Sequence, residues 1–106
     1  MSLELNYREF KGAGTVPCVV LHGLLGSSRN WSSTGNRMAE HFHVFALDLR
    51  NHGGSPHTET MDYPSMAGDV LAFLDQQGLS EVVLVGHSMG GKVAMRVACD
   101  HPERVL

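Results

Sequence analysis

A glycine-rich segment, Gly86-His87-Ser88-Met89-Gly90, fits the G-x-S-x-G pattern of a turn that presents a serine nucleophile. Four apolar residues precede this segment and a helix-like stretch follows it, which is the strand–turn–helix setting that the chemistry needs. A serine hydroxyl is a poor nucleophile unless it stands clear of the backbone and a base removes its proton. Gly86 and Gly90 lack side chains, so strand and helix can approach closely around the turn. The pattern predicts that Ser88 is a catalytic nucleophile.

Backbone N–H groups close to this serine could stabilise the negative oxygen of a tetrahedral intermediate. The N–H of Met89 opens the following helix, whose positive dipole end favours an anion. A second donor is expected from the loop after another central strand. The apolar run Val16–Leu21 ends in His22-Gly23, and the residue after them is Leu24. The sequence therefore predicts an oxyanion hole made of the N–H groups of Leu24 and Met89.

The longer stretch from Gly86 to Lys92 also fits most of the phosphate-binding P-loop, G-x-x-x-x-G-K-[ST]. That loop needs a hydroxyl directly after the lysine to ligate Mg²⁺. In this chain Val93 follows Lys92, and a valine side chain cannot coordinate a metal. The P-loop would also leave the His22-Gly23 stretch unexplained. These observations disfavour a nucleotide-binding site.

Strands and helices alternate along the chain in the order that βαβ units require. Strands are predicted at residues 3–10, 16–21, 44–47 and 82–85, the last three buried and the first with one exposed face. Helices are predicted at residues 31–41, between an N-cap at Asp62 and a C-cap at Gly78, and at 89–100. Val105 and Leu106 look like the start of a further strand. We therefore expect residues 1–106 to form the N-terminal portion of a single α/β domain, with a mostly parallel sheet, helices on both faces and a truncation at that strand.

The composition is that of an ordinary folded protein, with 42% apolar residues, 18% charged residues and a net charge of −3. No basic run is present, so neither nucleic acid nor an anionic membrane surface is an expected partner. No stretch approaches the length of a membrane span, and the N-terminus does not resemble a secretory signal. Cys18 and Cys99 are expected to be single buried thiols. These features favour a cytoplasmic protein.

Three stretches resemble the α/β-hydrolase family, in this order along the chain: His22-Gly23-Leu24, residues 48–55 (Asp-Leu-Arg-Asn-His-Gly-Gly-Ser) and residues 86–92. Within that family, three shorter stretches resemble a branch of small bacterial acyl esterases and thioesterases and their mitochondrial relatives: Arg50-Asn51-His52-Gly53, the helix start Tyr63-Pro64-Ser65-Met66-Ala67, and Gly90-Gly91-Lys92. The resemblance covers almost the whole chain. It implies the N-terminal half of the fold, a serine hydrolase without a cofactor, and a role for His22 in bracing the backbone of the oxyanion loop.

The catalytic acid and base of this family follow the serine in the chain. The acidic residues and the histidine that follow Ser88 here lie at the end of a helix of about a dozen residues, roughly 18 Å from it. The acid and base are therefore expected beyond residue 106, and this chain alone is expected to be inactive. His87 is expected to support the turn or to line a pocket. The remaining histidines, His41, His43, His52, His57 and His101, are predicted to lie on the surface or in loops, and no metal-ligand spacing is present.

Four other side chains have a structural alternative to a functional role. Asp48 and Arg50 could bind a charged substrate, but we expect them to hydrogen-bond and pair to hold their loop together. Trp31 could line an acyl pocket or pack the helix that begins there. Lys92 is expected to extend from its helix into water.

The predicted function is hydrolysis of a small carboxylic ester or acyl thioester through an acyl-enzyme intermediate. The serine turn is equally compatible with acyl transfer, carbon–carbon hydrolysis or a lyase reaction. A non-catalytic ligand-binding protein with this fold is the alternative outside the enzymes. Acyl length and oligomeric state do not follow from the sequence.

Overall fold

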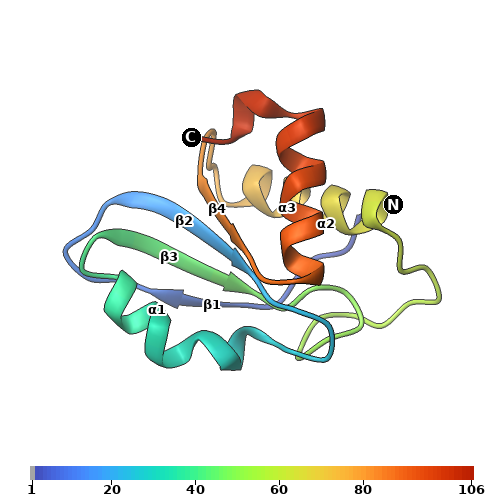
Figure 1. Ribbon diagram of the computed structural model, residues 1–106, viewed down its shortest axis with the longest axis horizontal. Helices are drawn as coiled ribbons and strands as arrows, with labels where there is room; N and C mark the ends of the chain where they lie inside the picture. Colours follow the sequence, from blue (N-terminus) through green and yellow to red (C-terminus); the bar gives the residue numbers. More distant parts are fainter. Residues whose placement is uncertain (1) are drawn as a thin grey trace.

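A four-stranded sheet forms the middle of the computed structural model, which describes residues 2–106 (Figure 1). Its strands are β1 (Tyr7–Phe10), β2 (Val16–Leu21), β3 (Phe42–Leu47) and β4 (Val83–Gly86), in the spatial order β1-β3-β2-β4. β2 pairs in parallel with both β3 and β4, whereas β1 is antiparallel to β3. The prediction of a mostly parallel α/β sheet is confirmed. Because β2 is central, the carboxyl ends of β2, β3 and β4 meet at one edge of the sheet.

The first strand is shorter than the predicted residues 3–10, because its early N–H groups have partners outside the sheet. The Leu3 N–H donates to the carboxylate of Asp69 at 2.8 Å, and the Asn6 N–H donates to the Ser55 hydroxyl at 2.8 Å. These bonds tie the N-terminal segment to a helix and a loop on the site side of the sheet. Ladder pairing begins only at Tyr7.

The helical elements are a 3₁₀ turn at Ser28–Trp31, α1 (Ser32–Met38), α2 (Tyr63–Gln76), α3 (Met89–Asp100) and a 3₁₀ turn at Pro102–Arg104. The predicted helix at 31–41 is thus divided and displaced. The Ser27 hydroxyl caps the first turn by accepting the Arg29 N–H, so helical structure starts earlier. β3 begins at Phe42, two residues before the predicted start. No helix among residues 2–106 has the length and apolar character needed to cross a bilayer.

Residues of β2 alternate between the two faces of the sheet, and each face is covered by different helices. Val19 and Leu21 belong to the core that α2 and α3 cover, whereas Cys18 and Val20 belong to a second core beside α1. The ribbon shows α1 below the sheet and the other two helices above it (Figure 1). This three-layer arrangement holds the ends of the parallel strands in fixed positions.

The strand β4 lies at the edge of the sheet, so residues 83–85 are half-buried rather than buried as predicted. Val82, just before β4, forms an isolated parallel bridge with Val105, as expected for the start of a further strand. Burial raises the pKa of the Cys18 thiol to about 11. Cys99 is exposed, contrary to the prediction, because it lies on the outer side of α3. Neither cysteine forms a disulfide.

Candidate active site

Ser88 occupies a strained turn between the end of β4 and the start of α3. Its backbone has φ 54° and ψ −113°, in a region that side chains other than glycine rarely adopt. The turn is fixed at both ends, because the His87 N–H donates to the Leu21 carbonyl at 3.0 Å and the Ser88 carbonyl accepts the Lys92 N–H at 3.1 Å. Ser88 is exposed. The sequence prediction of a sharp, strained turn at Ser88 is confirmed.

Two glycines allow the elements around Ser88 to approach one another. A Cβ atom on Gly90 would overlap the carbonyl oxygen of Leu21, at the end of the central strand. A Cβ atom on Gly86 would lie 2.5 Å from the carbonyl oxygen of Gly90. The start of α3 can therefore lie directly against the end of β2 only if these positions have no side chain.

The two N–H groups predicted to form an oxyanion hole lie at the same cavity as the serine. Leu24, Ser88 and Met89 all line a cavity of about 390 Å³. Within the described residues, neither the Leu24 N–H nor the Met89 N–H donates to a protein acceptor. The structure thus brings the serine and the Met89 donor together with a donor at Leu24, which lies 64 positions before Ser88 in the chain.

The rest of this cavity is largely apolar, with one charge of each sign. Met61, Tyr63 and Met66, from the start of α2 and the segment before it, line it together with Asp62 and Lys92. Asp62 caps α2 by accepting the Ser65 N–H at 2.7 Å. The Lys92 ammonium is exposed, as predicted, and lies 6.0 Å from the centroid of the Tyr63 ring. Met61, Asp62, Tyr63 and Met66 were not identified as candidate site residues from the sequence, because their pattern indicated only a helix start.

A second cavity of about 510 Å³ lies on the other side of Leu24. Trp31 lines it and also packs against the core beside α1, which confirms the packing role considered for this residue; Trp31 does not line the cavity that contains Ser88. His87 lines the same cavity and lies against Gly23, where a Cβ atom would be 2.8 Å from the His87 Nδ1 atom. The prediction that His87 lines a pocket is confirmed. The residue makes no hydrogen bond to Ser88.

His22 is buried at the end of β2 and both of its ring nitrogens have backbone partners. Nε2 accepts the Leu49 N–H at 3.0 Å, and Nδ1 donates to the Gly23 carbonyl at 2.7 Å. Burial lowers the pKa of His22, although the bond to the Gly23 carbonyl acts in the opposite direction. A neutral imidazole with both nitrogens engaged braces the loop, and has no free nitrogen with which to act as a base.

His52 was predicted to lie on the surface or in a loop; it does lie in a loop, but it is 7% exposed and therefore buried. Its Nε2 accepts the Leu25 N–H at 3.0 Å, and its Nδ1 donates to the Arg50 carbonyl at 2.9 Å. The ring centroids of His22 and His52 are 4.9 Å apart. The loop alternative is confirmed, and the surface alternative is wrong because His52 packs against the loop that follows β2.

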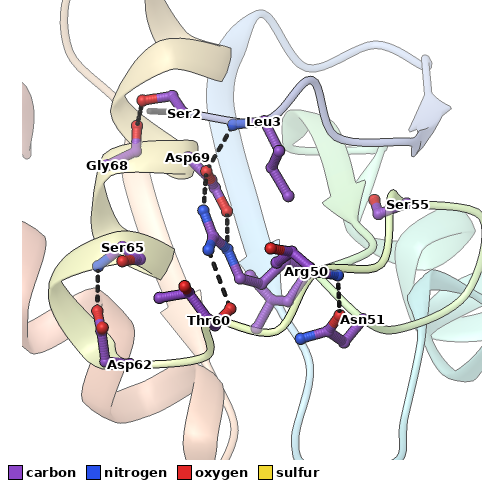
Figure 2. A network of polar contacts seen from close by, with 12 residues as sticks. Ser2, Leu3, Arg50, Asn51, Ser55, Thr60, Asp62, Ser65, Gly68 and Asp69 are labelled. Carbon is purple, nitrogen blue, oxygen red and sulfur yellow. Dashed lines mark hydrogen bonds and ion pairs between the residues drawn. The ribbon is translucent and has the colours of Figure 1, made fainter.

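Asp48 and Arg50 hold this segment in place, as predicted, although they do not pair with each other. Arg50 forms a bidentate ion pair with Asp69 of α2, at 2.7 and 2.9 Å, and also donates to the Thr60 carbonyl at 3.0 Å (Figure 2). The hydrogen bond to Asp69 raises the pKa of Arg50. The pair is buried, with its two side chains 3% and 1% exposed.

Asp48 accepts three hydrogen bonds from different parts of the chain. Its donors are the Ser28 N–H at 2.7 Å, the Asn6 side-chain amide at 2.7 Å and the Gly54 N–H at 3.0 Å. Burial alone would raise the pKa of Asp48, but these hydrogen bonds outweigh it and hold that pKa below its ordinary value. The carboxylate thereby joins the N-terminal segment, the loop after β2 and the loop after β3.

No histidine or carboxylate side chain within residues 2–106 hydrogen-bonds to the Ser88 side chain. His101 and Glu103 pair with each other at 3.2 Å beyond the far end of α3, where the predicted helix length puts them. Among the described residues, no cluster of three or more His, Cys, Asp or Glu side chains could hold a metal ion. The site as described therefore contains a candidate nucleophile and oxyanion donors, without an acid–base pair.

A mostly parallel sheet with a serine in a left-handed turn between strand and helix is the arrangement of α/β-hydrolases. The family model of the alpha/beta hydrolase fold matches residues 16–106, and the chain belongs to this family. The sn-1-specific diacylglycerol lipase of Mus musculus is 44% identical over an alignment of 106 positions, which covers 97% of this chain and 34% of that protein. Ethanol acetyltransferase 1 of Kluyveromyces marxianus is 41% identical over 90 residues, 83% of this chain and 25% of that protein.

A solved structure shows the same fold at higher identity. A marine microorganism esterase is 47% identical and has a TM-score of 0.95, over 98% of this chain and 40% of that chain. The chain therefore spans well under half the length of each of these three proteins. Its relatives include esterases and lipases, consistent with the resemblance noted in the sequence.

Proposed function

We propose that this chain carries the nucleophile and the oxyanion hole of a serine hydrolase that cleaves a carboxylic ester or an acyl thioester. The observation that carries the proposal is the cavity shared by Ser88, in its left-handed turn, and the unpaired N–H groups of Leu24 and Met89. The esterase and lipase relatives support the same reaction class.

In the proposed reaction the Ser88 Oγ forms a bond to the acyl carbon while its proton passes to a histidine base outside residues 1–106. The carbonyl electrons move onto oxygen, where the N–H groups of Leu24 and Met89 stabilise the negative charge. Collapse of this intermediate breaks the bond to the alcohol or thiol, which leaves with the proton from the base. Water then attacks the acyl-enzyme in the same way, and the carboxylic acid is released.

The side chains around Ser88 suit a small acyl group. Leu24, Met61, Tyr63 and Met66 give the cavity an apolar lining, and its volume of about 390 Å³ matches a compact ligand. The Lys92 ammonium is the positive charge at this cavity. We propose an ester or thioester with a short apolar acyl chain as the substrate class.

Replacement of Ser88 by alanine tests the proposal in the intact protein that contains this chain. Loss of the nucleophile should lower kcat for p-nitrophenyl esters by about 10⁴-fold or more, and should abolish labelling by a fluorophosphonate probe. Ser33→Ala is a matched control, because this serine is exposed on α1, on the other side of the sheet. Turnover that survives Ser88→Ala would refute the proposal. An intact protein that binds an ester without turnover or labelling would indicate a ligand-binding protein instead.

Acyl transfer to an alcohol is a second candidate, favoured by the similarity to ethanol acetyltransferase 1. Both reactions share the acyl-enzyme and differ in whether water or an alcohol accepts the acyl group. Adding ethanol to the hydrolysis assay separates them. A transferase would form ethyl ester at the expense of free acid at millimolar ethanol, whereas a hydrolase would continue to release mainly acid.

A further inference from the structure

His22 and His52 hold each other's loops by a reciprocal exchange of hydrogen bonds. His22 lies in the loop after β2 and accepts the Leu49 N–H from the segment after β3. His52 lies in that segment and accepts the Leu25 N–H from the loop after β2. Both rings are buried, with their centroids 4.9 Å apart.

The partners of each ring determine its tautomer. In both residues Nε2 faces an N–H group and must accept, while Nδ1 faces a carbonyl oxygen and must donate. Both imidazoles are therefore neutral and protonated on Nδ1. A protonated ring, or the opposite tautomer, would place an N–H group against the N–H of Leu49 or Leu25.

These bonds control the two peptide units on either side of the Leu24 Cα atom. The Gly23 carbonyl and the Leu24 N–H belong to one planar peptide unit, so holding the oxygen fixes the direction of the N–H. The His22 Nδ1–H and the Gly26 N–H both donate to that oxygen, at 2.7 and 3.0 Å. The next peptide unit contains the Leu25 N–H, which His52 holds at 3.0 Å. Leu25 has φ 65°, so this backbone is strained without those bonds.

We infer that His52 is a positioning residue for the oxyanion hole, which together with His22 fixes the direction of the Leu24 N–H. The inference deepens the proposed function and rests on it. His52 does not touch the cavity that Ser88 lines, and it acts through the Leu25 peptide unit. The substrate class it serves is the same ester or thioester, at the step where negative charge develops on the carbonyl oxygen.

Substitutions at His52 can separate its two hydrogen bonds. In His52→Gln the amide oxygen can replace Nε2 as the acceptor for the Leu25 N–H. In His52→Asn the shorter side chain can still donate to the Arg50 carbonyl, but it does not reach Leu25. His57→Asn is a matched control, because His57 is exposed on the same segment and has no hydrogen-bond partner among the described residues.

The experiment measures kcat and KM of these variants in the intact protein with a p-nitrophenyl ester. His52→Asn should lower kcat by about 100-fold with KM changed by less than about threefold, because a misplaced oxyanion donor is felt mainly in the transition state. His52→Gln should recover kcat to within about tenfold of the unmodified protein, and His57→Asn should leave both constants unchanged. Equal kcat values in His52→Asn and the unmodified protein would overturn the inference.

Tautomers measured by long-range ¹H–¹⁵N NMR provide a readout that needs no variant. The inference requires the Nδ1–H form at both His22 and His52, and an Nε2–H form at His52 would overturn it even if His52→Asn fails to fold. Ser88→Ala separates the proposed hydrolase function from the positioning role of His52. If Ser88→Ala retains turnover, the proposed function fails; if it abolishes turnover while His52→Asn does not alter kcat, only the positioning role fails.

Discussion

Two neighbouring regions of the molecule use their polar groups in opposite ways. In the β3 loop, residues 48–55, the polar side chains of Asp48, Arg50 and His52 are buried and hydrogen-bonded. In the β4 elbow, residues 86–89, Ser88 is exposed and the Met89 N–H has no protein acceptor among the described residues. The β3 loop therefore provides support, and the elbow leaves its donors available for a ligand.

Backbone strain also differs between the supporting β3 loop and the candidate site. Three non-glycine residues of the described chain have positive φ: Asn51 (66°) in the β3 loop, and Leu25 (65°) and Ser88 (54°) at the site. Asparagine tolerates this conformation, and the Asn51 side chain also accepts the Thr58 N–H at 2.6 Å. Leucine and serine have no such local compensation. Strain that the surroundings must hold in place is therefore concentrated at the candidate site.

The largest effect on stability is expected from the ion pair that supports the β3 loop. Arg50→Met would leave the Asp69 carboxylate buried without its cation, with the Leu3 N–H as its one remaining donor among the described residues. We expect the free energy of unfolding of the intact protein to fall by about 3–5 kcal/mol, measured by urea denaturation.

The double variant Arg50→Met/Asp69→Leu is the control for this prediction. Removing both charges leaves no isolated ion, so most of the lost stability should return. If Arg50→Met alone lowers the free energy of unfolding by less than about 1 kcal/mol, the ion pair does not support the β3 loop, and the proposed difference between the two regions is contradicted.

A smaller effect with a defined pH dependence is expected at Asp48. Its pKa is held below the ordinary value, so the stabilisation is present above pH 4 or so, and is lost as the pH falls through the lowered pKa. Asp48→Asn presents an amide N–H to N–H donors, and we expect a loss of about 1–3 kcal/mol at pH 7. The difference between variant and unmodified protein should shrink between pH 5 and pH 3 or so, measured by urea denaturation across this range.

Glu103→Gln is the matched control for the pH dependence. A hydrogen bond from its own backbone N–H, followed by one from His101, lowers the pKa of Glu103 as well, but this side chain is exposed to solvent. Its replacement should therefore change the pH dependence much less than Asp48→Asn does. A difference at Asp48 that is constant across the pH range would contradict the assignment of the effect to an ionised carboxylate.

Local patterns predicted most elements because capping and periodicity act within a few residues. α2 lies between Asp62, whose side chain accepts the Ser65 N–H, and Gly78, which has φ 69°. Ser88 and the strand–turn–helix around it were predictable for the same reason, since a short motif encodes the strained turn. The 31–41 helix was wrong in its bounds because the Ser27 cap moves the start and β3 begins earlier.

The partners of the β3 loop could not be predicted, because they come from distant parts of the sequence. His52 reaches a peptide N–H 27 positions before it, and Arg50 reaches a carboxylate 19 positions after it. A histidine that hydrogen-bonds to backbone groups has no sequence pattern of its own, because every residue other than proline offers the same N–H group. Only the folded arrangement of the two loops identifies such contacts.

The smallest effect, and the sharpest test of the strain comparison, is expected at Leu25. This side chain is 90% exposed, so its replacement removes little buried contact, whereas its φ of 65° disfavours leucine. Leu25→Asn should therefore raise the free energy of unfolding by about 0.5 kcal/mol, seen as a higher midpoint in urea. Leu24→Asn is the matched control, because Leu24 is 63% exposed and has no positive φ, and it should give no increase. Equal changes in the two variants would mean that the backbone at Leu25 is relaxed, and that the strain at the site lies at Ser88 alone.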